Sequence, residues 1–246
     1  MRALGVTLVS AWTWFVLAVC IVLWLPLMAV VRAVTQPFDR KLYAVGRLFR
    51  WVGIITGRAC PLWRFSVEGI AHRDSSRACV VVSNHESFVD IFLISHLPWE
   101  MKWMFKQELF RIPVLGWLLR LSGDIPIIRG ASRSAAKAMR TARDTLERGM
   151  SVMIFAEGTR SATGELLPFK DGAFRLAIDA GVPILPLAVT GTRHALNKHD
   201  WRVGPADAHV QVLPPVETTG LGHHDIEALK TRVRSMIAEA RSRQPV

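Results

Sequence analysis

The chain has 246 residues, half of them hydrophobic, and a formal net charge of +11. This length suits one α/β domain with an appendage, and three cysteines without paired spacing argue against a disulfide framework and for a reducing compartment. The charge indicates an anionic partner. Nucleic acid is not the partner that we expect, because no zinc-finger spacing, RNA-binding aromatic motif or helix-turn-helix pattern is present.

The first predicted element is a long apolar helix. Gly5 to Val31 includes no charged residue, and these 27 residues exceed the ~20 that cross a bilayer core as a helix. Arg32 and further cations follow, so the positive-inside rule places the downstream side in the cytoplasm. A secretory signal is the competing interpretation, but its apolar core is much shorter and no clear cleavage site is present. We therefore expect a membrane anchor.

A second helix is predicted from Leu42 to Thr56, where apolar residues recur at helical spacing. It is too short and too charged to span a bilayer, so we expect it at the interface, with Arg47 and Arg50 among anionic headgroups. Residues 1–60 hold seven Arg and Lys against one Asp, which supports a two-helix membrane anchor over this range. Whether the pair crosses once, re-enters on one side or packs on the rest of the protein stays open.

An α/β domain is expected over residues 61–246, beginning with an edge-type strand from Trp63 to Ile70. The next strand, Cys79 to Val82, is apolar and rich in Val, which is typical of a strand buried on both faces. His85 follows soon after this strand, at the carboxyl edge of the predicted sheet.

Asp90 follows His85 by five residues, at the start of a helical pattern. Its carboxylate can reach the imidazole if the loop folds over the helix N-terminus. A His oriented by a carboxylate is a general base for a substrate hydroxyl. The same residue types also serve as caps and helix-dipole partners, so this motif alone leaves both interpretations open.

Further along the chain, Lys106 ends a short strand and is either a cation for a phosphate or a solvated side chain. Arg129, after a strand from Ile125 to Ile128, is a weaker candidate for substrate contact. The segment Phe110 to Leu121 is apolar, and a helix is predicted from Ser132 to Arg148.

A second polar cluster, Glu157 to Ser161, directly follows a strand from Val152 to Phe155. Gly158 permits a tight turn, Thr159 offers a hydroxyl, and Arg160 presents a planar fork suited to phosphate or carboxylate. Parallel strands bind ligands at their carboxyl ends, so both clusters are expected to share one cleft.

The remaining pattern predicts a helix from Phe169 to Ala180, strands at Pro183–Val189 and His209–Leu213, and a closing helix from His223 to Arg243. Strands that alternate with helices predict an α/β fold with a mixed, mostly parallel sheet flanked by helices. The other histidines show no metal-ligand spacing, so no metal is expected.

Asn-His-x4-Asp at 84–90 and Phe-x-Glu-Gly-Thr-Arg-Ser at 155–161 together resemble the signature pair of the glycerolipid acyltransferase family, most of all its bacterial 1-acylglycerol-3-phosphate acyltransferases. The likeness covers roughly residues 60 to 215 and includes blocks at 106–129 and 182–189. It implies a glycerol-3-phosphate acyltransferase-like fold with an N-terminal two-helix membrane segment. It also implies that Phe110 to Leu121 contributes to an acyl-chain tunnel.

The resemblance implies transfer of an acyl group from acyl-CoA or acyl-carrier protein to the sn-2 hydroxyl of lysophosphatidic acid, at the cytoplasmic side of the bacterial inner membrane and without a cofactor. His85 is then the base and Asp90 its support. Arg160 and Lys106 hold the phosphate, beside Gly158 and Thr159, and Glu157 orients Arg160 or bonds a glycerol oxygen. A thioester is already activated, so no covalent acyl-enzyme is expected.

Other functions remain open at this stage. The same motifs serve acylation of glycerol 3-phosphate, of other lysophospholipids or of lyso-ornithine lipids. From another class, a non-catalytic membrane lipid-binding protein would keep the fold, but the intact His85 and Asp90 speak against it. The acyl donor, the chain-length preference and the oligomeric state are not fixed by the sequence.

Overall fold

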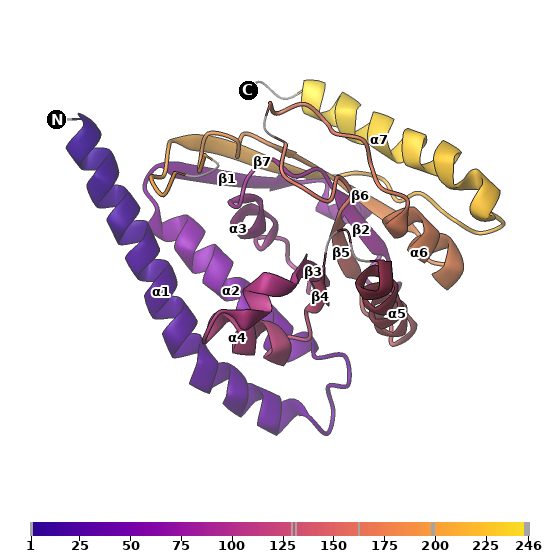
Figure 1. Ribbon diagram of the computed structural model, residues 1–246, viewed down its shortest axis with the longest axis horizontal. Coiled ribbons are helices and arrows are strands. Elements are labelled where there is room, and N and C mark those ends of the chain that lie inside the picture. The colour runs from indigo at the N-terminus through magenta and orange to yellow at the C-terminus, as the bar shows by residue number, and fades with distance from the viewer. Residues whose placement is uncertain (1, 129, 131, 162, 198–199, 244–246) are drawn as a thin grey trace.

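The computed structural model describes residues 2–128, 130, 132–161, 163–197 and 200–243, and its centre is a seven-stranded sheet in the order β1-β7-β6-β2-β5-β3-β4 (Figure 1). The strands are β1 (Trp63–Glu68), β2 (Val80–Ser83), β3 (Lys102–Lys106), β4 (Ile125–Ile127), β5 (Val152–Phe155), β6 (Ile184–Thr190) and β7 (Ala206–Val212). The helices are α1 (Arg2–Thr35), α2 (Tyr43–Ala59), α3 (Asp90–Ile94), α4 (Leu115–Leu121), α5 (Ser132–Glu147), α6 (Gly172–Ala180) and α7 (Ile226–Ser242), with short 3-10 turns η1 (Ile70–His72), η2 (Gln107–Arg111) and η3 (His223–Asp225).

Strand direction places the carboxyl ends of five strands at one edge of the sheet. β2 to β6 all run parallel, whereas β7 is antiparallel to β6 and β1 is parallel to β7. Ser83 is in register with Phe155 on one side and Leu187 on the other. The predicted mixed, mostly parallel sheet is confirmed, and the residues that follow β2 and β5 emerge side by side.

Apolar side chains cover both faces of the sheet. Val81, Met153 and Leu185 belong to one core, which they share with residues of α1 to α4. Val80, Val152 and Ile184 belong to the other, beneath α5, α6 and α7. A strand buried on both faces needs consecutive apolar residues, which explains the Val-rich run of β2.

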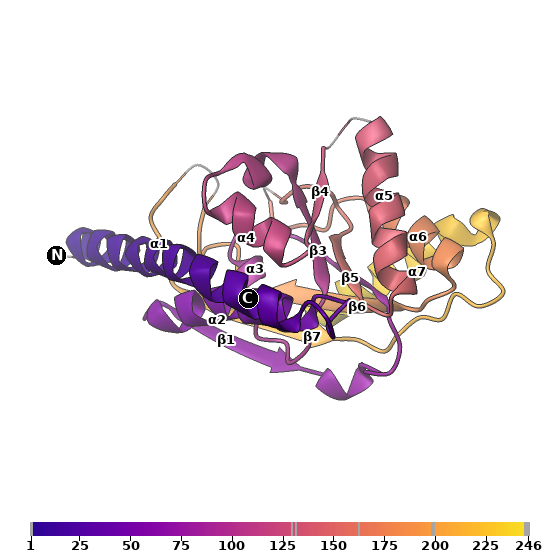
Figure 2. The same cartoon turned by 90° about the horizontal axis from the view of Figure 1, so that it is seen from below.

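The two N-terminal helices form a pair along one side of the molecule (Figure 2). Cys20 and Met28 of α1 and Phe49 of α2 join the same core as the sheet. Three indole N–H groups of α1 donate to backbone carbonyls outside it, those of Trp12, Trp14 and Trp24 to Ala59, Trp201 and Leu48. The expected division at residue 60 coincides with the end of α2, but the core continues across it.

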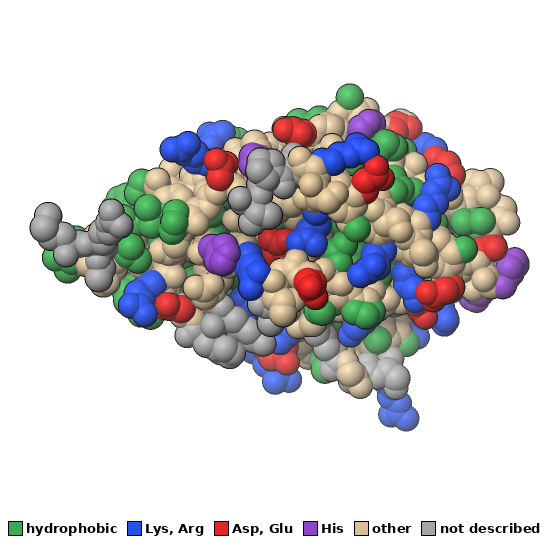
Figure 3. All heavy atoms as spheres, turned by 90° about the horizontal axis from the view of Figure 1, so that it is seen from above, with side chains coloured by type: hydrophobic (Ala, Val, Ile, Leu, Met, Phe, Trp, Pro, Cys, Tyr) green, Lys and Arg blue, Asp and Glu red, His purple; other side chains and the backbone are tan. Residues whose placement is uncertain are grey.

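The opposite face of α1 is apolar and exposed. Helix α1 is long and apolar enough to cross a membrane by length and composition, and only 11% of its most apolar window is buried. The exposed side chains recur every three or four residues and so lie on one face: Leu4, Leu8, Trp12, Phe15, Val19, Val22, Leu23, Leu27, Val30 and Val34. We call these residues the apolar stripe, and part of it is visible where α1 projects at the left of Figure 3. A helix in water shows the reverse pattern, polar side out.

The expectation that the cations of α2 face lipid headgroups is wrong for Arg50. Arg50 is 4% exposed and pairs with Asp124 at 2.7 Å and with Glu100 at 3.3 Å. Arg47 donates to the Leu97 carbonyl at 2.7 Å. The acidic partners lie far away in sequence, so the helical pattern alone could not reveal this inward-facing charge.

Candidate active site

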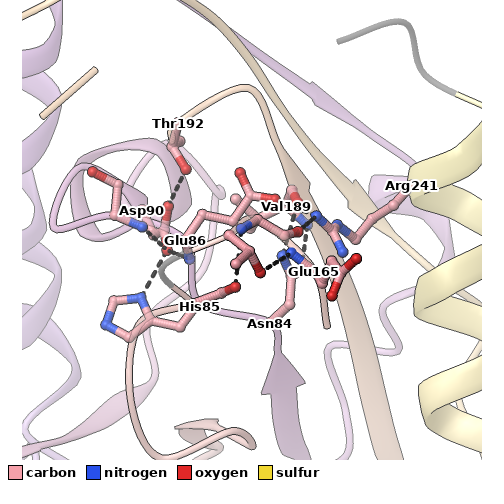
Figure 4. A network of polar contacts seen from close by, with 12 residues as sticks. Asn84, His85, Glu86, Asp90, Glu165, Val189, Thr192 and Arg241 are labelled. Carbon is pink, nitrogen blue, oxygen red and sulfur yellow. Dashed lines mark hydrogen bonds and ion pairs between the residues drawn. The ribbon is translucent and has the colours of Figure 1, made fainter. Parts of the chain in front are cut away.

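The imidazole of His85 contacts the carboxylate of Asp90 as expected. Nδ1 lies 2.7 Å from Asp90 Oδ2, and the Asp90 side chain is fully buried (Figure 4). A carboxylate accepts, so Nδ1 carries the hydrogen in this pair and Nε2 is left as the acceptor. Figure 4 shows the ring pointing away from Arg241, on the other side of the motif loop.

Asp90 is held by more groups than the motif indicates. Its Oδ2 also accepts the backbone N–H groups of Glu86, at 2.8 Å, and Ser87, at 3.0 Å. Its Oδ1 accepts the hydroxyl of Thr192, which follows β6. The loop therefore closes around the carboxylate at the start of α3, and four donors fix its position.

The second motif holds the backbone and the ring of His85. The His85 N–H donates to Glu157 Oε1 at 2.8 Å, and the Ser161 N–H donates to the His85 carbonyl at 2.9 Å. The imidazole stacks on Phe155, with ring centroids 3.9 Å apart and planes at 17°. Residues of β5 and its following loop thus orient the His85 imidazole, which follows β2.

Glu157 positions the loop that carries His85. Its second oxygen accepts the Leu167 N–H at 2.9 Å, so both oxygens bind backbone amides. The expected contact of Glu157 with Arg160 or with a glycerol oxygen stays a prediction. Burial raises the pKa of Glu157 above its ordinary value, and the two backbone hydrogen bonds oppose this shift.

Asn84 fastens the end of β2 to β6. Its side-chain amide donates to the Val189 carbonyl at 2.9 Å and accepts the Val189 N–H at 2.8 Å, as a paired strand residue would. The amide is buried, so both bonds are made away from water. The position of His85 is therefore fixed from both neighbouring strands.

The predicted cations lie beside this cluster without touching His85. Gly158 has φ of +69°, and the stem of Lys170 lies where a side chain at Gly158 would point. Arg160 follows in the same loop, half-buried, and Lys106 is exposed at the carboxyl end of the adjacent β3. No described residue forms an ion pair or side-chain hydrogen bond with Arg160 or Lys106.

The loop residues differ in exposure. Thr159 is exposed, whereas Ser161 is buried and accepts the Gly164 N–H at 3.0 Å. Arg129 lies outside the described residues. In the described part of the chain, no group of three or more His, Cys, Asp or Glu is arranged to hold a metal ion.

An ion pair that the motifs do not indicate ties both loops to the C-terminal helix. Arg241 of α7 contacts Glu86 Oε1 at 2.5 Å and the Gly164 carbonyl at 2.6 Å (Figure 4). The pKa of Glu86 is raised to about 7, mainly by burial and also by Asp90 and Glu157, while Arg241 opposes the shift. Arg241 thus pairs with Glu86, one carboxylate of a group of three that also includes Asp90 and Glu157.

An apolar cavity of about 260 Å³ lies next to the motif loop, between α1, α2, α3 and the η2–α4 segment. Its walls combine residues that adjoin the first motif with apolar residues of the helix pair and of η2–α4: Trp14, Leu17, Ile21, Phe49, Arg50, Val52, Gly53, Phe88, Ile91, Phe92, Ser95, Phe105, Leu109, Ile112, Leu115 and Leu119. The segment predicted to line a tunnel, Phe110 to Leu121, supplies three of them.

Three residues of the site were not predicted from the sequence. Thr192 had a usable signal, because it is a hydroxyl just beyond the carboxyl end of a buried strand. Glu86 lies inside the first motif, but nothing in the sequence shows that it is buried. Arg241 had no signal, since 155 residues separate it from its partner Glu86.

Comparison with known proteins places this geometry in context. A model of the Acyltransferase family matches residues 64–190. A chloroplastic 1-acyl-sn-glycerol-3-phosphate acyltransferase of Brassica napus is 39% identical over 54% of this chain and 39% of its own length. The 1-acyl-sn-glycerol-3-phosphate acyltransferase alpha of Homo sapiens is 38% identical over 70% of this chain and 61% of its own length. The chain thus spans less than two thirds of either relative.

A solved structure is similar over almost the whole chain. The crystal structure of the 1-acyl-sn-glycerophosphate (LPA) acyltransferase from Thermotoga maritima has a TM-score of 0.84 and 26% identity. The match covers 98% of this chain and 96% of that one, so it includes both N-terminal helices.

Proposed function

The chain belongs to the acyltransferase family, and we propose that it transfers an acyl group from a thioester to the free sn-2 hydroxyl of lysophosphatidic acid, forming phosphatidic acid. The observation that carries the proposal is the His85–Asp90 pair, with 2.7 Å between Nδ1 and Oδ2 and a fully buried carboxylate. The similar proteins of known name, which are acyltransferases for the same acceptor, support it.

In the proposed reaction, Nε2 of His85 accepts the hydroxyl proton while the hydroxyl oxygen attacks the thioester carbonyl. Asp90 keeps the hydrogen on Nδ1 and stabilises the imidazolium that forms. Collapse of the tetrahedral intermediate breaks the carbon–sulfur bond, and the proton passes from Nε2 to the departing thiolate. The products are the new ester and a free thiol, and His85 returns to its neutral form.

We assign the phosphate of the acceptor to the loop after β5. Arg160 is the planar donor for a phosphate, and Lys170, whose stem crosses Gly158, and Lys106 on β3 add positive charge. These side chains have no acidic partner among the described residues and so can meet an anionic ligand. Binding there would leave the glycerol hydroxyl free to reach His85.

The acyl chain fits the apolar cavity, because its walls are apolar and it adjoins the motif loop at Phe88 and Ile91. We propose that the protein lies on the cytoplasmic side of a bacterial inner membrane, with the apolar stripe of α1 in the lipid. Since α1 packs on α2 and α4 along its other face, it inserts as part of the folded protein instead of crossing alone. The donor, acyl-CoA or acyl-carrier protein, then arrives from the aqueous side.

The test is acyl transfer from a radiolabelled acyl thioester to lysophosphatidic acid by the full chain in detergent. We expect His85→Ala to lower kcat about a thousandfold with a small change in KM. Arg160→Ala should raise the acceptor KM with a smaller effect on kcat, and exposed Arg175→Ala serves as the control. Transfer to another lysolipid but not to lysophosphatidic acid would contradict the acceptor. No transfer to any acceptor would favour a binding protein.

A further inference from the structure

A hollow of about 470 Å³ opens at the end of α1 and is lined by Arg32, Gln36, Arg40, Leu42 and Arg148. The three arginines come from the last turn of α1, from the α1–α2 turn and from the end of α5. Figures 1 and 2 both show this turn beside the end of α5, and Lys41 reaches the Gly149 carbonyl at 3.4 Å. The fold therefore brings together cations that are more than a hundred residues apart in sequence.

No carboxylate lines this hollow, and no described residue forms an ion pair or hydrogen bond with the side chain of Arg32, Arg40 or Arg148. The nearest acid in the turn, Asp39, already accepts the Ala44 N–H at 2.7 Å at the start of α2. The three arginines line one hollow, so an anion between them would offset the mutual repulsion of their positive charges. Guanidinium groups suit phosphate oxygens, because each offers paired donors.

The position of the hollow indicates where such a phosphate comes from. The apolar stripe of α1 ends beside it at Val30 and Val34, and Phe38 of the same turn is 87% exposed. A surface this apolar is stable in lipid, and aromatic side chains and cations next to it lie at the level of the headgroups.

We propose that Arg32, Arg40 and Arg148 form an arginine cradle for the phosphate of an anionic phospholipid headgroup. The cradle is separate from the acceptor site at Arg160, and it fixes the depth and tilt of α1 in the membrane. The proposal rests on the proposed membrane association of α1.

The experiment measures binding of the full chain to vesicles of phosphatidylcholine alone and of phosphatidylcholine with phosphatidylglycerol. Binding to phosphatidylcholine alone reports on the apolar stripe, and the ratio between the two vesicles reports on the cradle. The test variant carries Arg32→Gln, Arg40→Gln and Arg148→Gln. The control carries Arg140→Gln, Arg175→Gln and Arg232→Gln, which remove the same charge from exposed positions on α5, α6 and α7.

We expect the wild type and the control to prefer the anionic vesicles. The cradle variant should lose at least tenfold of this preference, since a cation at a membrane surface contributes roughly fivefold. An equal preference in all three proteins would overturn the cradle. Binding of inorganic phosphate to the wild type but not to the cradle variant, together with an equal preference of both for anionic vesicles, would assign the site to soluble phosphate and overturn the lipid headgroup. Failure to bind phosphatidylcholine alone would count against the stripe, and binding to the anionic vesicles, compared between the cradle variant and the control, would then test the cradle.

Discussion

The protein buries two charged networks, and they differ in balance. Behind α2, Arg50 and Lys102 face Glu100 and Asp124, all buried, so two cations meet two anions. At the carboxyl edge of the sheet, three carboxylates gather near His85, those of Glu86, Asp90 and Glu157, and Arg241 forms an ion pair with one of them, Glu86. In the first network each carboxylate has a cationic partner. The second network holds more carboxyl groups than cations.

This difference indicates that the first network stabilises the fold and that the second serves the candidate active site. In the balanced network every charged group has a partner. The backbone N–H of Trp103 and the hydroxyl of Ser122 also donate hydrogen bonds to Asp124. A buried charge whose partners are fixed mainly specifies how the helices pack. In the unbalanced network the pKa of two carboxylates is raised, and an imidazole keeps one nitrogen free. Four substitutions probe this contrast.

The largest change in stability should come from the balanced network. Arg50→Met leaves Asp124 and Glu100 buried without their cation, so the free energy of unfolding should fall by about 3–5 kcal/mol. Urea unfolding in detergent measures it, and Arg58→Met, exposed on the same helix, is the control. A loss no larger than that of the control would show that the network is not needed for the fold.

Removing the cation of the unbalanced network should affect catalysis more than folding. Arg241→Gln frees the loops that carry Glu86 and Gly164, so kcat should fall about tenfold to a hundredfold with little change in KM. Adding Glu86→Gln should restore part of the rate, because the uncompensated carboxyl is gone. Arg234→Gln is the matched control, since it sits on the same helix and donates to the Leu166 carbonyl. Equal rates for the single and double variants would argue against an electrostatic role.

A smaller effect is expected from Thr192→Val, which removes one donor from Asp90 and keeps the shape of the side chain. We expect kcat to fall by roughly fivefold, the scale of one lost buried hydrogen bond. Thr218→Val is the control, because Thr218 is also buried and donates to the Val182 carbonyl at 2.9 Å, away from the site. Equal loss of kcat in both variants would remove Thr192 from the support of Asp90.

The last expected effect is a pH dependence of stability. The pKa of Glu86 rises from 4.5 to about 7 on folding, so the folded state holds this proton more tightly than the unfolded state. Its contribution to stability is full below about pH 4.5 and is lost as the pH rises to about 7. The stability of Glu86→Gln relative to wild type should therefore rise across this window and then level off. A difference that stays constant with pH would contradict the burial of this carboxyl.

The parts of the site that are local in sequence could be predicted. His85 and Asp90 are five residues apart around a helix start, and Glu157 to Arg160 follow a buried strand, so strand and helix patterns alone bring them to one edge. The strands of the sheet could be predicted because their signal is also local, most clearly in β2, where a run of valines indicates burial on both faces.

The long-range contacts could not be predicted. Arg241 meets Glu86, and Arg50 meets Asp124, only because the chain returns after many residues. Arg50 looked like a surface cation because a helical pattern shows which face is apolar, not which charges find a buried partner. The partners of Glu157 were missed for a related reason, since they are backbone amides and carry no sequence signal.

The most direct test compares Asp90→Asn with Asp124→Asn, one carboxylate from each network. Acyl transfer to lysophosphatidic acid is measured per folded molecule, and unfolding is followed in the same samples. We expect Asp90→Asn to lower kcat about a thousandfold, and Asp124→Asn to lower the free energy of unfolding while the folded molecules keep a kcat near that of wild type. Similar losses of kcat in both variants, or a nearly active Asp90→Asn protein, would contradict the separation of a catalytic network from a structural one.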